Sequence, residues 1–141
     1  MREVYEIGIV FRGFVIVQTK FKELPKQSDT DKDLRGAFIS AITTFAENFF
    51  ANTSLEYLES GDFLFVFKIE KIQASDSPKE EPIIMYGLIE KKKKPDKIVK
   101  KFLEKVNPIF QLFIHKYNNE DFTELTQFEP FEQEIRSFFE K

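Results

Sequence analysis

The sequence predicts an α+β protein with a single five-stranded antiparallel sheet, helices on both faces of the sheet, and the element order β-β-α-β-β-β-α-α. Three observations predict this fold. Two hydrophobic strands open the chain, an amphipathic helix follows them, and three further strands lead into helices that continue to the end. The eighteen phenylalanines of the 141-residue chain follow these periods, alternating in strands and recurring at helical spacing elsewhere. The length suits one core, so we expect residues 1–141 to form a single domain.

The first two strands are predicted at about 4–11 and 14–21. Both faces of the first strand are largely apolar, which is typical of an inner strand whose two faces are covered. Arg12 and Gly13 separate the strands and predict a tight hairpin turn in which Gly13 takes a positive φ angle. The second strand alternates between apolar and polar residues near its end, which indicates a more solvated, edge-like position.

A helix is predicted at about 31–51, because apolar residues recur there at the spacing of one helical face. Thr30 and Asp31 are suitable N-caps, and Asn52 is expected to end the helix. The apolar face consists of Leu34, Ala37, Phe38, Ala41, Ile42, Phe45 and Phe49.

Three more strands are predicted at about 54–59, 63–72 and 82–90. Ser60-Gly61-Asp62 predicts a turn between the first two, and the polar stretch at 73–81 predicts a hairpin loop. The last strand is apolar on both faces, so we place it in the middle of the sheet.

The rest of the chain is predicted to be helical at about 95–117 and 130–140. Pro95 suits the first turn of the longer helix. Asn107-Pro108 is expected to kink or split that helix, because proline removes a main-chain hydrogen bond and crowds the previous turn. The segment between the two helices is expected to be a packed link through Phe122, Leu125 and Phe128.

This order of elements resembles the longin domain, which is related to the roadblock and profilin-like folds. The resemblance is one of topology and hydrophobic pattern, and it covers nearly the whole chain. A roadblock domain usually has a helix before its first strand, whereas here the strand starts at Val4, which favours the longin domain. The residues that carry the resemblance are the hairpin Tyr5 to Phe21, the helix Leu34 to Phe49, the strand Phe63 to Ile69, and the strand Ile83 to Ile89 leading into Ile98 to Tyr117.

The resemblance implies a non-catalytic protein-interaction module, an adaptor or regulator that associates with a small Ras-like GTPase or a vesicle-trafficking complex. The implied partners are such a GTPase or another longin-like or roadblock-like chain, including a second copy in a homodimer. The implied sheet order places the strands at 14–21 and 54–59 at the edges, where another chain can pair through main-chain hydrogen bonds. The residues expected at these pairing edges are Val15, Val17, Thr19, Leu55 and Tyr57.

The composition excludes several kinds of site. With no cysteine and one histidine, the chain has no thiolate nucleophile and no cysteine-based metal site. It contains neither GxxxxGK[ST] nor GxGxxG, so we do not expect it to be a GTPase or a dinucleotide-binding protein itself. We predict no catalytic residue, no metal and no cofactor. The net charge of −3 argues against nucleic acid as a partner. The lack of cysteine fits a cytoplasmic protein, and the lysine cluster described next adds the expectation of peripheral contact with a membrane.

A cluster of lysines is the strongest polar feature of the sequence. It is either the solvated surface of a strand-to-helix connection or a contact for an acidic partner or for the headgroups of an anionic membrane. Cations at a helix N-terminus oppose the helix dipole, which favours a bound anionic partner. The predicted contact residues are Lys91, Lys92, Lys93, Lys94, Lys97 and Lys101, and Lys100 and Lys105 continue the cluster.

Opposite charge gathers in the C-terminal segment, which suits self-association or docking to a charged partner. The acidic residues there are Glu120, Asp121, Glu124, Glu129, Glu132 and Glu134.

Other conspicuous residues have structural explanations. His115 is interpreted as a structural histidine on an amphipathic helix. The alternating Asp29, Asp31 and Asp33 suit helix capping, because a calcium loop needs a longer pattern. Nearly every phenylalanine is expected in the core. The exceptions are the pairs Phe49-Phe50 and Phe138-Phe139, because neighbours on a helix cannot face the same way.

Three other functions are considered. A ligand-sensing module of the PAS or GAF type would need a polar internal pocket where this sequence places phenylalanine, isoleucine and valine. A profilin-like cytoskeletal binder is disfavoured by the missing N-terminal helix and the absence of tryptophan. An enzyme that uses carboxylates such as Glu47 or Glu56 would need a pairing that the sequence does not define.

Overall fold

The computed structural model describes residues 3–23, 38–42, 44 and 57–140. Within these residues the chain forms five strands, two α-helices and a 3₁₀ helix, and residues 38–42 and 44 are also helical. The strands are β1 (Val4–Phe11), β2 (Phe14–Lys20), β3 (Tyr57–Ser60), β4 (Phe63–Ile72) and β5 (Glu81–Glu90). The helices are α2 (Pro95–Tyr117), η1 (Leu125–Phe128) and α3 (Glu129–Glu140).

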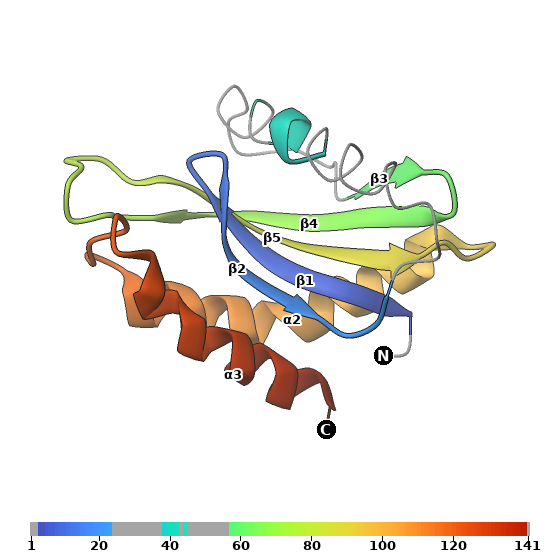
Figure 1. The fold of residues 1–141 in the computed structure, drawn as a ribbon. Coiled ribbons are helices and arrows are strands. Elements are labelled where there is room, and N and C mark those ends of the chain that lie inside the picture. Colours follow the sequence, from blue (N-terminus) through green and yellow to red (C-terminus); the bar gives the residue numbers. More distant parts are fainter. Residues whose placement is uncertain (1–2, 24–37, 43, 45–56, 141) are drawn as a thin grey trace.

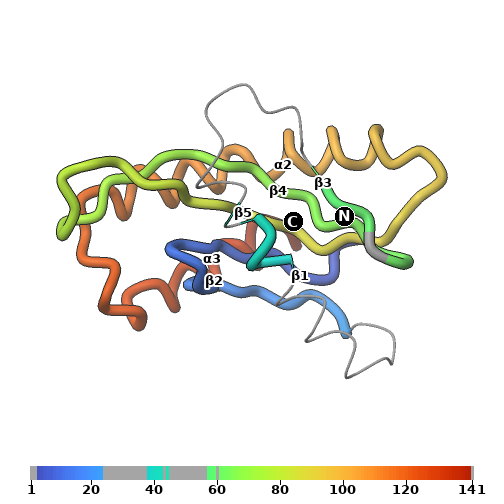
Figure 2. The backbone as a smooth tube through the Cα atoms, turned by 90° about the horizontal axis from the view of Figure 1, so that it is seen from above, coloured from blue at the N-terminus to red at the C-terminus, as the bar shows by residue number. Residues whose placement is uncertain are grey.

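The strands form one open antiparallel sheet in the order β2-β1-β5-β4-β3. The strand β5 is central, and β2 and β3 are the outer strands. Helices α2 and α3 lie against one face of the sheet, and the helical segment 38–42 lies over the other (Figure 1). Seen from above, α2 follows the β4 side of the sheet and α3 follows the β2 side (Figure 2). The fold is therefore an α+β arrangement of one sheet between helices.

The observed elements agree closely with the predicted ones. The bounds of β1, β4 and α2 are those predicted from the sequence, and β2, β5 and α3 differ by one residue at one end. The third strand continues to Ser60, and its predicted start at 54–56 lies outside the described residues. Most of the helix predicted at 31–51 also lies outside them, and its described part is helical.

Two details of the C-terminal half differ from the prediction. Helix α2 is not split at Asn107-Pro108, which lies inside one continuous helix, and the expected kink there stays a prediction. Pro108 is exposed, whereas Val106 and Ile109 beside it are buried, so packing against the sheet holds the helix together while water can bind the freed carbonyl. The predicted link around Leu125 is also more regular than expected, because residues 125–128 form a 3₁₀ helix that leads directly into α3.

The hairpin between β1 and β2 has the predicted tight turn. Arg12 and Gly13 have φ angles of 51° and 81°, as a two-residue turn with both central residues in the left-handed region requires. Phe14 follows the turn and is 71% exposed, so the expectation that it belongs to the core is wrong. Phe14 follows the tip of the hairpin and belongs to neither hydrophobic core of the described residues.

The two faces of the sheet carry separate hydrophobic cores. The larger core joins the sheet to α2, η1 and α3, and it contains the fully buried Phe102, Phe110, Phe113, Phe128 and Phe131. The smaller one joins the other face to Phe38 and Ile42 of the helical segment. Phe38 stacks on Phe65 with 4.2 Å between ring centroids. Of the described residues of the predicted apolar face, Phe38 and Ile42 therefore pack against the sheet, whereas Ala41 is exposed.

A glycine on each face makes room for an aromatic ring. A Cβ atom at Gly87 would lie 2.1 Å from the ring of Phe102, and a Cβ atom at Gly8 would lie 2.4 Å from the ring of Tyr86. No side chain fits at these distances without moving the ring. The glycines therefore let α2 approach β5 on one face and let Tyr86 cross β1 on the other.

Candidate functional site

The C-terminal part of the outer edge of β2 is covered by α3. The main-chain N–H of Gln18 donates to the carboxylate of Glu132 at 3.3 Å, and the Thr19 hydroxyl donates to the main-chain oxygen of the same residue at 3.1 Å. Arg136 donates to the main-chain oxygen of Lys20 at 2.8 Å. These side chains bond two of the main-chain groups that a pairing strand would need, the N–H of Gln18 and the carbonyl of Lys20, which protects this part of the edge in the way native sheets commonly do.

The predicted edge residues consequently have different surroundings. Val17 and Thr19 are buried and pair with Ile9 and Ile7 of β1, and Val15 is half-buried. On the opposite edge, Tyr57 of β3 is half-buried. Its hydroxyl donates to Asp96 of α2 at 3.0 Å, which raises the pKa of the Tyr57 phenol. Leu55 lies outside the described residues.

The predicted lysine cluster divides into paired and unpaired residues. Lys91 lies 3.0 Å from Glu59 and Lys92 lies 3.5 Å from Glu90, while the ammonium group of Lys105 lies 5.4 Å from the ring centroid of Phe139. The other members form the lysine patch, which consists of Lys93, Lys94, Lys97, Lys100 and Lys101. All five are exposed, and no carboxylate among the described residues lies within ion-pair distance of them.

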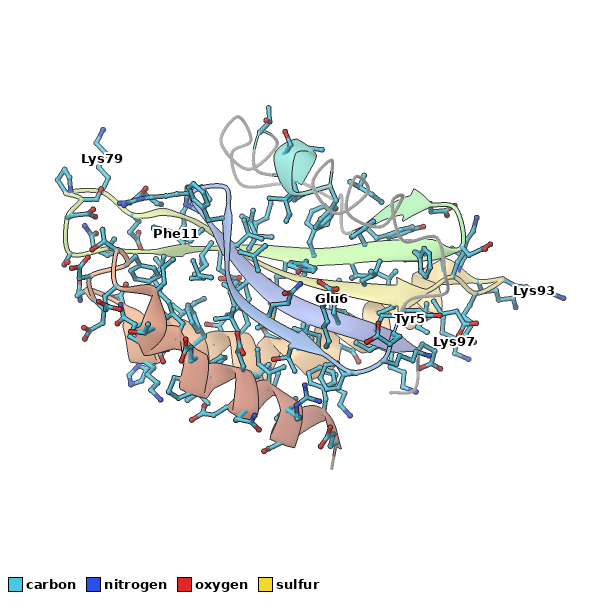
Figure 3. All side chains as sticks on the ribbon, viewed as in Figure 1. Tyr5, Glu6, Phe11, Lys79, Lys93 and Lys97 are labelled. Carbon is cyan, nitrogen blue, oxygen red and sulfur yellow. The ribbon has the colours of Figure 1, made fainter. Side chains whose placement is uncertain are left out.

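The lysine patch lies at one end of the molecule, where β5 passes into α2. Figure 3 shows Lys93 pointing away from the sheet at this end, with Lys97 on the first turn of α2 close by, and Lys79 at the opposite end. The acidic Glu104 is exposed on the same helix and limits the patch on the side towards the C-terminus.

The acidic C-terminal segment is largely engaged in local structure. Asp121 accepts hydrogen bonds from the N–H and hydroxyl of Thr123, at 2.9 and 2.6 Å, and Glu124 accepts corresponding bonds from Thr126. These bonds lower the pKa of both carboxyl groups. Glu134 lies 3.7 Å from Lys116. The segment therefore serves first to form turns and helix starts.

A second ionic cluster joins the two hairpins of the sheet. Arg12 donates to Glu81 at 2.8 and 2.6 Å and to Asp76 at 3.1 and 2.8 Å. The hydrogen bonds from Arg12 lower the pKa of Asp76. In turn, the carboxylates of Glu81 and Asp76 raise the pKa of the Arg12 guanidinium. This cluster ties the β1–β2 turn to the β4–β5 loop, and its geometry is that of a structural clamp.

An apolar groove runs between α2 and α3 on the side away from the sheet. Its volume is about 320 Å³. Leu112 in the groove is 45% exposed, and Phe138 is half-buried. The groove is lined by Ile109, Leu112, Gln133, Glu134, Ser137 and Phe138.

A second hollow lies between β4 and α2. It has a volume of about 270 Å³ and is lined by Lys68, Lys100, Leu103, Glu104 and Asn107. Lys68 already donates to Asn107 across this hollow.

A buried polar group that the sequence analysis did not identify lies on the sheet face covered by the helical segment. Glu6 of β1 is 2% exposed and accepts hydrogen bonds from the Tyr86 hydroxyl at 2.7 Å and from the Gln18 side chain at 3.0 Å. The one signal in the sequence was a carboxylate inside an otherwise apolar strand. Because the group is shielded from solvent and already hydrogen-bonded, it is placed to order the core rather than to meet a substrate.

The remaining candidates are dispersed. His115 is exposed on α2, Phe139 is buried, and Phe138 beside it is half-buried. No three histidine or carboxylate side chains in the described parts of the chain come together in a group that could hold a metal ion. Four sets of predicted residues lie outside those parts: Asp29, Asp31 and Asp33; Glu47; Phe49 and Phe50; and Glu56.

No helix in the residues covered by the structure is both long enough and apolar enough to span a membrane. Comparison of the chain with protein-family models, with curated protein sequences and with solved structures finds no match.

Proposed function

We propose that this chain is a longin-like protein-interaction module, an adaptor or regulator that associates with a small Ras-like GTPase or a trafficking-type complex. The observation that carries the proposal is the sheet order β2-β1-β5-β4-β3, with helical cover on both faces. The longin resemblance implies the same two outer strands. Fold likeness alone does not define a function, so the surfaces of the molecule have to support it.

The interior of the described structure supports binding rather than catalysis. Its buried polar side chains, Glu6 and Thr19, are hydrogen-bonded to other parts of the protein. Both cores are filled by aromatic and aliphatic side chains, and the two hollows described above lie at the surface. A ligand-sensing module would instead bury a polar pocket.

The groove between α2 and α3 is the surface that we assign to the protein partner. It has an apolar floor at Ile109, Leu112 and Phe138 and a polar rim at Gln133, Glu134 and Ser137, which is the anatomy of a protein interface. Strand addition at β2 is the weaker choice, because Glu132 and Arg136 already occupy that edge.

A pull-down with purified protein tests the proposal. The chain is immobilised and exposed to a panel of Ras-like GTPases, each loaded with GDP or with a non-hydrolysable GTP analogue, and its own mass is measured by size-exclusion chromatography with light scattering. We expect at least one GTPase, or a second copy of the chain, to bind. A strict monomer that retains no GTPase in either state would contradict the proposal.

Matched variants test the assignment of the groove. Leu112→Glu places a charge on the apolar floor, whereas Gln111→Glu places the same charge on the adjacent exposed position of α2. We expect Leu112→Glu to abolish retention and Gln111→Glu to preserve it. Equal retention by both variants would remove the groove from the proposal and direct the search to the strand edges.

A further inference from the structure

The lysine patch is a set of cations without counter-charges inside the described structure. Lys91 and Lys92 have carboxylate partners, at Glu59 and Glu90, but the five residues of the patch do not. Cations that gather at one end of an acidic protein repel one another, and no carboxylate in the described residues forms an ion pair with these five. Their arrangement therefore calls for an anionic surface outside the molecule.

The chemistry of the patch distinguishes between kinds of anionic surface. All five of its cations are lysines and none is an arginine. Arginine is the side chain that recognises single carboxylates in a fixed, forked geometry, whereas a lysine ammonium group acts as a flexible point charge. Flexible point charges match a continuous layer of anionic headgroups better than the fixed carboxylates of a folded partner.

The described residues place no exposed apolar anchor within the patch, which leads to the same choice. Protein interfaces have an apolar centre with aromatic or aliphatic side chains. The large hydrophobic side chains that are exposed in the described structure are Phe14, Leu112 and Leu125, and none of them belongs to the patch or adjoins it in the sequence.

We propose that the lysine patch docks this protein onto the surface of an anionic membrane by electrostatic adsorption, without insertion of any segment. Lys93 and Lys94 in the β5–α2 connection and Lys97, Lys100 and Lys101 on α2 contact the headgroups. The opposite end of the molecule, which carries Lys79 in the β4–β5 loop, then points away from the membrane (Figure 3). This docking goes beyond the proposed GTPase association and does not depend on it.

The test uses the purified full chain and two kinds of vesicle, phosphatidylcholine alone and phosphatidylcholine with phosphatidylserine as a minority lipid. Co-sedimentation should show binding to the anionic vesicles only, and the binding should weaken as salt is added, because salt screens exposed charges. Binding to both kinds of vesicle, or to neither, would overturn the proposal. Binding to poly-glutamate without binding to vesicles would assign the patch to an acidic protein instead.

Two triple variants with the same change of net charge test the location. Lys93→Glu, Lys97→Glu and Lys101→Glu together alter the patch, and Lys20→Glu, Lys71→Glu and Lys79→Glu together alter three exposed lysines elsewhere. Each lysine near an anionic surface increases the affinity for it about fivefold. The patch variant should therefore bind the anionic vesicles at least about a hundredfold more weakly than wild type. The control variant should bind them only a few-fold more weakly. An equal loss of affinity in both triple variants would show that net charge alone matters.

Two further measurements keep folding and partner binding separate from this result. Circular dichroism should be the same for wild type and both triple variants, because every altered side chain is exposed. If the glutamate variant of the patch does not fold, the corresponding glutamine variant should fold and still lose most of the vesicle binding. Leu112→Glu should bind vesicles as wild type does, so failure of the GTPase test leaves the membrane test intact.

Discussion

The two faces of the sheet are built differently, although both are buried. The face covered by α2 and α3 is closed by aromatic and aliphatic side chains throughout, with Phe102 seated on Gly87. The face covered by the helical segment at 38–42 also has an apolar core, but it contains the carboxylate of Glu6 bound to the Tyr86 hydroxyl. Apolar packing is strong but not directional, whereas a buried hydrogen bond fixes a particular arrangement. We therefore expect the first face to supply most of the stability and the second to fix the position of its aromatic rings.

The largest expected effect is on the α2 and α3 face. Phe102→Ala removes a ring that is 1% exposed and should lower the free energy of unfolding by about 3–5 kcal/mol, because both the burial and the packing around the cavity are lost. Phe14→Ala makes the same change at a residue that is 71% exposed. It should alter the free energy of unfolding by less than about 0.5 kcal/mol. Urea denaturation measures both, and similar losses would show that burial does not decide the contribution of phenylalanine here.

A pair of glycine substitutions compares the faces directly. Gly87→Ala displaces Phe102 and Gly8→Ala displaces Tyr86, and each should cost about 1–3 kcal/mol through overpacking. Gly8→Ala should also change the near-ultraviolet circular dichroism of tyrosine, because its Cβ atom meets the Tyr86 ring and hydroxyl. If either variant is as stable as wild type, the corresponding ring has room to move and the close approach is not a constraint.

The hydrogen bond between Glu6 and Tyr86 should contribute less. Tyr86→Phe keeps the ring and removes the hydroxyl, so the expected loss is about 1 kcal/mol. Glu6→Leu removes the acceptor and keeps a side chain of similar length, so it serves as the second arm of a double-mutant cycle. A coupling energy near zero would mean that the two groups are neighbours without a stabilising bond.

The smallest effect is expected outside both faces, at the clamp formed by Arg12. The pKa of Asp76 is lowered in the folded protein, so the stability it contributes is present above the unfolded pKa of about 3.9 and is lost as the pH falls through the folded value. Asp76→Asn should therefore lower the melting temperature slightly at about pH 7, and the difference should shrink as the pH falls below about 3.9 and vanish below the folded pKa of Asp76. A difference that persists at the lowest pH would point to a role of Asp76 other than its charge.

Local patterns account for the parts of the fold that the sequence predicted. The alternation in β1 and β4 and the helical spacing in α2 gave their bounds, because burying one side of a strand or helix fixes the period of its apolar residues. The Arg12-Gly13 turn was equally local, since a two-residue hairpin requires positive φ angles. The lysine patch could also be found as a cluster in the sequence.

Contacts between residues far apart in the chain could not be predicted in this way. The burial of Glu6 depends on Tyr86, and the clamp at Arg12 depends on Asp76 and Glu81. The interpretation of β2 as a pairing edge took no account of Glu132 and Arg136, which reach it from α3. The fold was also needed to tell which lysines are paired, because Glu59 meets Lys91 only when the sheet brings the β3–β4 hairpin next to the end of β5.

The bounds of β1, β4 and α2 and the tight turn were determined by the sequence alone, because each depends on residues only a few positions apart. The tertiary structure alone decided which edge of the sheet is covered, which carboxylate is buried and which cations are left without partners. These depend on where distant segments meet, and the hydrophobic period of a strand or helix specifies that a face is buried without specifying what covers it.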